Sequence, residues 1–461
     1  MTTRVVAGKY VLAQREASQV LLQDHYVYVD GPKIEAVTRD APAPGQALIR
    51  YEQGLVMPGF VNLHAHCIRG GLFRGIPDDL EMEPPFIPRL VYTILLPLTG
   101  LAAKELSAGE LRAVTALGMI DLLKGGSTTV LDMWHHGQEV FFDVAREIGL
   151  RTVGAPFIMS ASNSRLGPDG YPLWDFGNDG AAQLAKTIAL FKARDQGRDG
   201  LAQVAIGPHA TDTCLPELLR ECRKAADELG CLLTTHFAQT PQEISLLKKK
   251  YGMGAAEYAR HAGLLGRNVV LAHAGCASDD ELKVLADTGT HVANCALTFA
   301  REGINFPYAR FARAGINTGL GTDSHGMDFI GEMRTAGLLS KQHVGKAHAG
   351  TAHELVRAGT LNGATALGRP DLGRIEAGAK ADLIVFDLFK PHLQPVWDPL
   401  KNLVWKGHAG DIALVMVHGE PVVRDGRLLK ADEAAVMRHA ALAARKIWNI
   451  AEQRQILPKS A

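Results

Sequence analysis

The sequence predicts an α/β protein whose largest part is a (β/α)8 barrel. Between Gly59 and Leu367, apolar strand patterns alternate with helical patterns, as in AQVAIGP followed by LPELLRECRKAADELG. This alternation is typical of parallel βαβ units. The stretch has room for the eight units that close a barrel. We therefore expect a barrel over residues 59–367, with an open, doubly wound sheet as the alternative architecture.

Both ends of the chain carry strand patterns of another kind. Residues 1–58 contain VVAGKYVLA, VLLQDHYVYVDGPKIEAVT and ALIRYEQGLV, separated by polar turns. Residues 368–430 include DIALVMVHGEPVVRDGRLL, with a hairpin turn predicted at His418-Gly419-Glu420. The two ends can pair into one small β domain with the barrel inserted in it. Residues 431–461 have apolar residues at helical spacing and predict a terminal helix.

The composition indicates a globular protein and excludes several classes of partner. Lys and Arg together number 49, as do Asp and Glu, and 47% of the residues are hydrophobic. This balance excludes a disordered chain, a nucleic-acid-binding surface and a polybasic membrane surface. The longest uncharged run, residues 90–103, is too short to span a membrane. The six cysteines form no CxxC pair and no signal peptide is visible, so we expect a cytoplasmic protein with reduced thiols.

The stretch FVNLHAH is the sharpest local signal for chemistry. Side chains two residues apart on a strand point to the same face, so His64 and His66 project together. At the carboxyl end of a first barrel strand they would lie at the mouth of the barrel. Two imidazoles in this arrangement suit one Zn²⁺ or Fe²⁺ ion. The alternative interpretation is a pair of polar loop residues.

Three further strand patterns end in metal-ligand residue types. His236 ends CLLTTH, His273 ends NVVLAH, and Asp323 ends INTGLGTD. An isolated histidine at a strand end is usually a core residue with satisfied hydrogen bonds. Because the strand ends of a barrel meet at one mouth, however, four histidines and one aspartate at strand ends indicate a shared site.

These motifs together resemble the metal-dependent amidohydrolase superfamily, in the branch that holds atrazine chlorohydrolase and cytosine deaminase. The resemblance is carried by VMPGFVNLHAH, GGSTTVLDM, LAHAG, GLGTDS and ATLNGATALGRPDLGRIEAGAKADLIVFD, and it extends over residues 5–429. It implies a distorted (β/α)8 TIM-type barrel with a small β-sandwich formed by both chain ends. Within the branch, the chain looks most like the phenylurea and thiocarbamate (molinate) hydrolases.

By position, the resemblance implies that His64, His66, His236 and Asp323 hold one divalent metal ion. Zn²⁺ is expected, with Fe²⁺ or Co²⁺ as alternatives. No lysine stands at the end of AQVAIGP, where two-metal members carry one, so a single metal is expected. Asp323 would act as general base and then as general acid. His273 would be a fifth ligand or would stabilise the oxyanion.

The resemblance also implies substrate-binding positions, some of which depart from the usual pattern. His209 matches a position that touches substrate. Gln239 stands where deaminases of the branch carry a glutamate that protonates a ring nitrogen, and an amide cannot shuttle a proton. Asn294 and Trp134 occupy positions expected to shape the pocket. The apolar, proline-rich segment 70–98 is expected to form a packed lid, a dimer contact or a pocket wall.

These observations leave three functional hypotheses. The first is a mononuclear metal hydrolase that cleaves a C–N bond of a small, largely apolar, possibly xenobiotic amide, urea or carbamate. The second is an aminohydrolase or dechlorinase of an N-heterocycle such as a triazine, purine or pterin, and Gln239 counts against it. The third is a scaffold with a vestigial metal site. In each case a homodimer or a higher homo-oligomer is expected.

Overall fold

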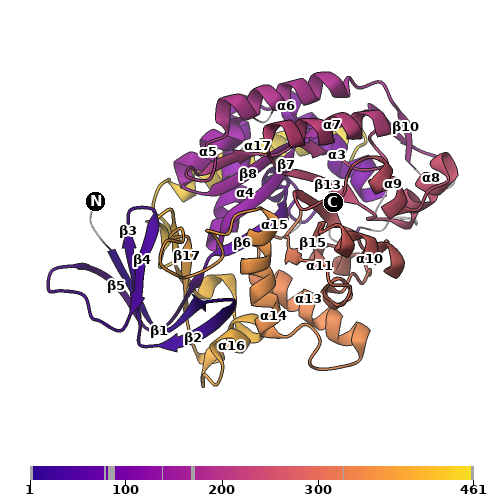
Figure 1. Ribbon diagram of the computed structural model, residues 1–461. Coiled ribbons are helices and arrows are strands. Elements are labelled where there is room, and N and C mark those ends of the chain that lie inside the picture. Colours follow the sequence, from indigo (N-terminus) through magenta and orange to yellow (C-terminus); the bar gives the residue numbers. More distant parts are fainter. Residues whose placement is uncertain are drawn as a thin grey trace.

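The computed structural model describes residues 4–76, 79–80, 89–137, 139–167, 172–324 and 326–457. It consists of a barrel and a mixed β-sheet beside it (Figure 1). The barrel strands run parallel to their neighbours and fall into two groups. One group contains β6 (Phe60–Ala65), β7 (Ser127–Trp134), β8 (Arg151–Ile158), β11 (Ala202–Val204) and β12 (Gly207–Pro208). The other contains β13 (Leu233–Phe237), β14 (Val269–His273), β15 (His291–Asn294) and β16 (Thr318–Leu320).

Single bridges join the two groups of strands and close the barrel. Ala65 at the end of β6 bridges to Asp323 just after β16, and Ile206 between β11 and β12 bridges to Leu233 of β13. With β11 and β12 sharing one strand position, the predicted eight-stranded barrel is confirmed, and the open sheet is excluded. The distortion lies at these two seams, where isolated bridges replace a continuous hydrogen-bonded ladder.

Helices surround the barrel and connect its strands (Figure 1). Local sequence signals set several of their ends. Ser107 and Glu110 form a capping box at the start of α4, and Gly230 in the left-handed region ends α7. The helices are α1 (Cys67–Leu72), α3 (Leu96–Glu105), α4 (Ala108–Lys124), α5 (Val140–Ile148), α6 (Gly180–Arg194), α7 (Pro216–Leu229), α8 (Pro241–Tyr251), α9 (Ala255–His261), α10 (Asp279–Asp287), α11 (Ala296–Arg301), α12 (Tyr308–Arg313), α13 (Phe329–Val344), α14 (Ala352–Arg357), α15 (Gly363–Ala366), α16 (Pro399–Lys406) and α17 (Glu433–Gln453). Shorter helical turns are η1 (Leu90–Leu95), η2 (Ala358–Asn362), η3 (Pro391–Leu393) and η4 (Ala409–Asp411).

Strands from both chain ends form one mixed sheet of nine strands. Its order is β20-β19-β18-β17-β5-β1-β3-β4, with β2 paired to β1. The two ends meet where β5 and β17 pair antiparallel. The hairpin turn predicted at His418-Gly419 joins β18 to β19, with both residues at positive φ. The strands are β1 (Arg4–Arg15), β2 (Ser18–Gln23), β3 (Tyr26–Asp30), β4 (Lys33–Thr38), β5 (Ala47–Pro58), β17 (Leu383–Asp387), β18 (Ile412–Val417), β19 (Glu420–Arg424) and β20 (Arg427–Leu428). A separate hairpin consists of β9 (Asn163–Leu166) and β10 (Pro172–Asp175).

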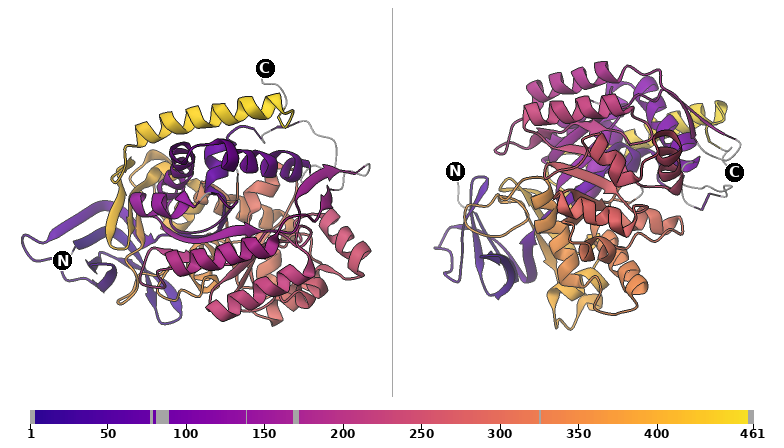
Figure 2. Two further views of the ribbon diagram at one scale, coloured as in Figure 1. Left: turned by 90° about the horizontal axis from the view of Figure 1, so that it is seen from above. Right: turned by 45° about the vertical axis from the view of Figure 1, so that its right-hand side comes forward.

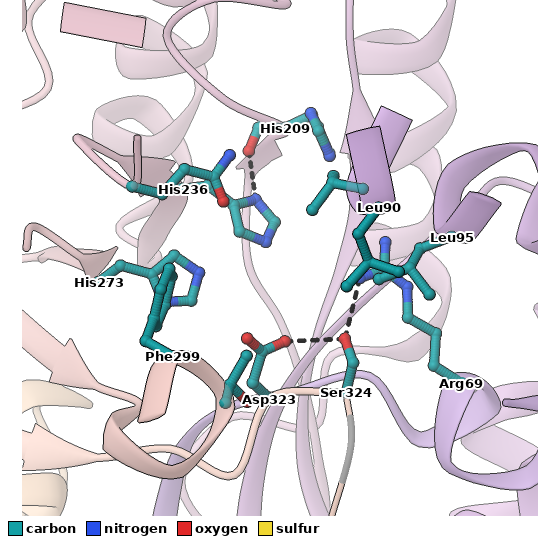
Figure 3. Close-up of a pocket in the computed structure, with 12 residues that line it drawn as sticks. Arg69, Leu90, Leu95, His209, His236, His273, Phe299, Asp323 and Ser324 are labelled. Carbon is teal, nitrogen blue, oxygen red and sulfur yellow. Dashed lines mark hydrogen bonds between the residues drawn. The ribbon is translucent and has the colours of Figure 1, made fainter. Parts of the chain in front are cut away.

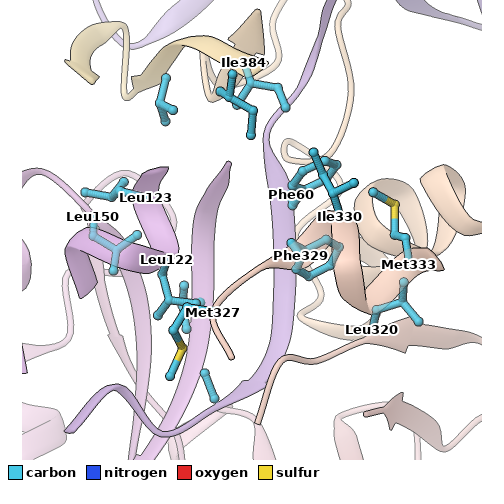
Figure 4. Close-up of a cluster of buried hydrophobic side chains, with 14 of the residues drawn as sticks. Phe60, Leu122, Leu123, Leu150, Leu320, Met327, Phe329, Ile330, Met333 and Ile384 are labelled. Atoms are coloured by element: carbon cyan, nitrogen blue, oxygen red, sulfur yellow. The ribbon is translucent and has the colours of Figure 1, made fainter. Parts of the chain in front are cut away.

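A continuous hydrophobic core connects the sheet to the barrel. The rings of Phe60 and Phe329 stack with centroids 4.7 Å apart, and Ile384 of the sheet belongs to the same buried cluster (Figure 4). A buried ion pair adds a fixed link, because Arg151 Nε donates to Asp382 Oδ2 at 2.6 Å. The first barrel strand is thus anchored from behind, which helps to hold its carboxyl end in place.

The long helix α17 lies along the outside of the barrel, above α4 in the left view of Figure 2. Its small and apolar side chains, among them Ala440, Ala444 and Ile447, pack with Val114 of α4. In the part of the chain that the structure describes, no helix is long and apolar enough to cross a membrane.

Candidate metal and substrate site

Five predicted residues meet at the carboxyl ends of the barrel strands. His64, His66, His236, His273 and Asp323 are each at most 7% exposed. The Nε2 atoms of His66 and His236 lie 3.4 Å apart. The Nε2 atoms of His64 and His66 lie 3.8 and 3.6 Å from Oδ1 of Asp323. The convergence expected from the strand ends is therefore present in the fold.

The way β6 ends explains how its two histidines reach the mouth. Val61 and Leu63 belong to the buried cluster inside the barrel. The register with β7 then shifts between Asn62 and Ala65. Such an irregularity changes the direction of the side chains that follow it. His64 and His66 consequently face the same site as the other strand ends.

The donor atoms fit a divalent metal ion. Ligands held at about 2.0–2.2 Å in a tetrahedron are about 3.4 Å apart, which matches the separations above. Both ring nitrogens of His64 are buried, and neither has a hydrogen-bond partner among the residues that the structure describes. A buried polar atom without a partner is costly, and a bound metal ion would satisfy one of these two nitrogens. The imidazole and carboxylate set suits Zn²⁺ and Fe²⁺.

Backbone carbonyls fix the proton positions on two of these rings. His66 Nδ1 lies 2.8 Å from the carbonyl oxygen of Met133, and His236 Nδ1 lies 2.5 Å from that of His209. A carbonyl only accepts hydrogen bonds, so each Nδ1 carries the proton. The Nε2 lone pair of each ring then points to the centre of the site, as in metal-ligating histidines.

Burial keeps the imidazoles neutral. It lowers the pKa of His64 and His66 well below the usual value, and the neighbouring histidines add to the effect for His64. It also lowers the pKa of His236 to about 3 and that of His273 to about 4. Neutral rings are the form that binds metal.

Two of the site residues have unusual backbone conformations. His273 has φ of 78° and Asp323 has φ of 55°, a region that residues other than glycine seldom occupy. Two backbone hydrogen bonds connect Asp323 to the end of β6. The N–H of Asp323 donates to the carbonyl oxygen of His64 (2.9 Å), and the N–H of His66 donates to the carbonyl oxygen of Asp323 (3.2 Å). Strained backbone held in this way is characteristic of functional sites.

A pocket opens above these residues (Figure 3). Leu90, Val91, Leu95 and Phe299 form its apolar wall. The first three come from η1, so part of segment 70–98 lines the pocket, while Leu72, Phe73 and Leu98 of the same segment pack in a buried cluster. Residues 77–78 and 81–88 lie outside the described part. The polar lining consists of Arg69, His209, His236, Gln239, His273, Thr298, Asp323 and Ser324.

Gln239 lies in this pocket and is held from both its side chain and its backbone. Its Nε2 donates to the hydroxyl of Tyr92 at 3.4 Å, and Tyr92 donates to Oδ2 of Asp212 at 2.7 Å. The carboxyl group of Glu243 accepts hydrogen bonds from the N–H groups of Ala238 and Gln239, both at 2.9 Å. Burial, together with nearby Asp212, raises the pKa of Glu243 to about 8. Burial also raises the pKa of Asp212 to about 6.

The remaining predicted substrate residues divide into two groups. His209 lines the pocket, with Nδ1 2.9 Å from Oγ1 of Thr213. Trp134 and Asn294 are not among its lining residues. Trp134 stacks on Phe141 with ring centroids 4.2 Å apart, on the helix side of β7. Asn294 donates from Nδ2 to the carbonyl oxygen of Phe306 at 3.0 Å and thereby holds a loop. Neither Trp134 nor Asn294 therefore lines the described pocket.

Sequence reasoning missed Arg69 and its link to the metal side. Nη1 of Arg69 donates to Oγ of Ser324 at 3.0 Å, and Ser324 donates to Oδ1 of Asp323 at 2.8 Å (Figure 3). Burial lowers the pKa of Arg69 to about 10, so the group stays charged at neutral pH. The sequence carried no signal for Arg69, because its place in the pocket depends on how α1 packs over the mouth. Tyr92, Asp212 and Glu243 were also missed, and only Glu243 had a signal, as the third residue after the helix-capping Thr240.

Comparison with known proteins places this geometry in context. Residues 55–422 match the amidohydrolase family. A 5'-deoxyadenosine deaminase from Methanopyrus kandleri is 31% identical over 395 residues, which is 84% of this chain and 86% of the relative. A zinc-bound adenosine deaminase from Xanthomonas campestris superposes with a TM-score of 0.85 at 26% identity and covers 97% of this chain and 99% of its own.

Atrazine chlorohydrolase from Arthrobacter aurescens TC1, complexed with zinc, superposes with a TM-score of 0.86 at 25% identity. The match covers 95% of this chain and 99% of that one. The expected superfamily, branch and fold are therefore confirmed, as is a hydrolase that acts on C–N bonds. The chain belongs to the amidohydrolase family.

Proposed function

We propose that the protein is a divalent-metal-dependent aminohydrolase that removes an exocyclic amino group from an N-heterocycle. The observation that carries the proposal is the meeting of His64, His66, His236, His273 and Asp323 at one barrel mouth. The 5'-deoxyadenosine deaminase and the atrazine chlorohydrolase that resemble this chain support an N-heterocycle as substrate. These relatives favour the aminohydrolase hypothesis over the hydrolysis of an amide, urea or carbamate.

The residues at the strand ends would bind the metal ion and move the proton. His64, His66, His236 and Asp323 would hold the metal ion, which supplies a nucleophile at neutral pH by lowering the pKa of water. Asp323 stands at the site where that proton is released, and its carboxylate can accept the proton and pass it to the leaving nitrogen. Ser324 donates to Oδ1 of Asp323 and so fixes the orientation of the carboxylate.

His273 would stabilise the charge that develops at the attacked carbon. Its Nδ1 is buried without a hydrogen-bond partner from the described residues, and the ring lines the pocket beside Phe299. A preorganised donor in a dry site stabilises an oxyanion far more than it would in water. The apolar wall of η1 supports this role because it excludes water from the same volume.

Gln239 determines what the ring nitrogen of the substrate can receive. An amide can donate or accept a hydrogen bond but cannot transfer a proton near pH 7. The network of Tyr92 and Asp212 fixes its side chain, which favours a heterocycle held by hydrogen bonding rather than by protonation. The same residue favours, as second candidate, hydrolysis of an amide, urea or carbamate, where no ring nitrogen needs a proton.

A product screen separates the two candidates. Zinc-loaded protein is incubated with aminated purines, pyrimidines and triazines, and in parallel with anilides, phenylureas and thiocarbamates. We expect chelator-sensitive release of ammonia from the first panel. Release of an amine or aniline from the second panel alone would contradict the proposal and favour the second candidate. The variant Asp323→Asn is the control, because activity that it retains comes from a contaminant.

A further inference from the structure

We propose that Arg69 binds an anionic oxygen of the substrate, such as a carboxylate or an ionised ring oxygen, beside the reacting carbon. This inference rests on the proposed function, because it names the class of substrate that the same pocket accepts. It makes Arg69 a specificity-determining residue that the resemblance to the family did not supply.

The first support is an unsatisfied cation inside the pocket. Arg69 is 4% exposed and lines the pocket, yet its Nη2 has no hydrogen-bond partner in the described part of the chain. Among the described residues, no carboxylate lies within ion-pair distance of its guanidinium group. The carboxyl groups of Asp323 and Asp132 attract the guanidinium group only from beyond ion-pair distance, and a buried donor without a hydrogen bond is expensive. A bound substrate can supply the acceptor that Nη2 of Arg69 lacks.

The second support is the charge of the pocket as a whole. Asp323 is the only acidic side chain that lines the described pocket. The position where related deaminases carry a glutamate holds the neutral Gln239. With a divalent ion bound, the ion and Arg69 would outweigh the carboxylate of Asp323 among the lining groups, although Asp132 behind Arg69 offsets part of this positive charge. An anionic substrate balances this charge, whereas a protonated ring would increase it.

The third support is the position of the guanidinium group. It lies beside Leu90 and Leu95 of η1 and contacts Ser324, which in turn contacts Asp323 (Figure 3). The apolar side chains exclude water from one face of the cation, which strengthens an ionic hydrogen bond. Two hydrogen bonds, through Oγ of Ser324, connect the guanidinium group of Arg69 to Oδ1 of Asp323. An anionic oxygen bound there would belong to the ring or chain that carries the scissile C–N bond.

The test uses benzoate and its neutral isostere benzamide as probes of the zinc-loaded protein. Dissociation constants are measured by calorimetry at fixed ionic strength. We expect the wild type to bind benzoate at least about tenfold more tightly than benzamide, as one charge-assisted hydrogen bond to arginine implies. In Arg69→Met this preference should vanish. In Arg69→Lys, which keeps the charge but loses the planar fork, it should be intermediate.

Two controls separate ligand binding from structural support. Ser324→Ala breaks the link to Asp323 but leaves the cation, so the benzoate preference should remain. Arg112→Met removes an exposed arginine paired with Glu147 and should change nothing. Metal content and melting temperature are measured on every variant. No preference in the wild type, or a preference that persists in Arg69→Met, would overturn the inference.

The outcome is distinguishable from failure of the proposed function. If ammonia is released from neutral heterocycles and benzoate is not preferred, the function holds and the role of Arg69 is wrong. If the benzoate preference depends on Arg69 but no heterocycle is deaminated, the anion site holds and the function is wrong.

Discussion

The two sides of the pocket are built in different ways. On the strand side, His66 and His236 have their Nδ1 atoms fixed by carbonyl oxygens, and Asp323 is fixed by Ser324. On the opposite side, Nη2 of Arg69 has no partner among the described residues, and Gln239 donates to the hydroxyl of Tyr92 from η1. Under the proposed function, the residues at the strand ends would carry out the reaction, whereas Arg69 and Gln239 would select the substrate.

The largest effect is expected on the strand side. His64→Ala removes a buried ligand, so metal affinity should fall by more than the 10- to 100-fold that loss of an outer hydrogen-bond partner costs. Hydrolytic activity should fall to background with it. Metal content after gel filtration and the rate of substrate turnover measure both. His353→Ala is the matched control, because that side chain is 58% exposed. Full metal content in His64→Ala would contradict the assignment of this side.

Trp134 separates packing from substrate binding. Trp134→Ala should lower the free energy of unfolding by about 3–5 kcal/mol, because it leaves a cavity against Phe141 and Phe142. The KM of the folded protein should stay unchanged. Denaturant unfolding and steady-state kinetics test both statements. Trp397→Ala, which removes a side chain that is 93% exposed, should affect neither quantity. A raised KM in Trp134→Ala would restore the role first predicted for it.

The substrate side should respond in KM. Tyr92→Phe removes the acceptor of Gln239 and the donor of Asp212, which frees the amide side chain and leaves a buried acid unpaired. We expect KM to rise about tenfold with a smaller change in kcat, since a lost hydrogen bond of this kind is worth about 1–2 kcal/mol. Tyr28→Phe removes a hydroxyl in the mixed sheet and is the control. A fall in kcat at constant KM would show that the two sides are not separable.

The smallest effect is a pH dependence of stability from Glu302, at the end of the pocket helix α11. Burial raises the pKa of Glu302 from 4.5 to about 7. The folded state therefore holds this proton more tightly than the unfolded state. The resulting stabilisation is complete below about pH 4.5 and is lost as the pH rises through 7. Because the side chain is partly exposed, we expect about 1 kcal/mol after solvent screening.

The prediction for Glu302 is tested by comparing two proteins that differ only at this residue. Free energies of unfolding are compared for wild type and Glu302→Gln from pH 5 to pH 8. The wild type should lose stability relative to the variant as the pH rises. An equal pH dependence of the two proteins would rule out a raised pKa for Glu302.

The sequence could predict the strand side of the site for a physical reason. His64, His66, His236, His273 and Asp323 each end an apolar strand pattern, and a barrel brings strand ends together. Arg69 and Tyr92 gave no such signal, because their place in the pocket depends on how α1 and η1 pack over the mouth.

Trp134 shows where strand patterns are insufficient. All eight residues of β7 are buried, so hydrophobicity does not reveal which face points inward. Leu131 and Met133 belong to the cluster inside the barrel, and the alternation of side chains along the strand then places Trp134 on the helix side. The position of Trp134 at the end of β7 does not by itself show whether its side chain points into the barrel or toward the helices.

The most direct test is anomalous diffraction at the zinc edge from crystals of the zinc-loaded protein. We predict one ion per chain, bound by Nε2 of His66 and His236, a ring nitrogen of His64 and the carboxylate of Asp323, each at about 2.0–2.2 Å. An ion elsewhere, two ions at the barrel mouth, or a mouth without an ion in protein that still releases ammonia would contradict the account.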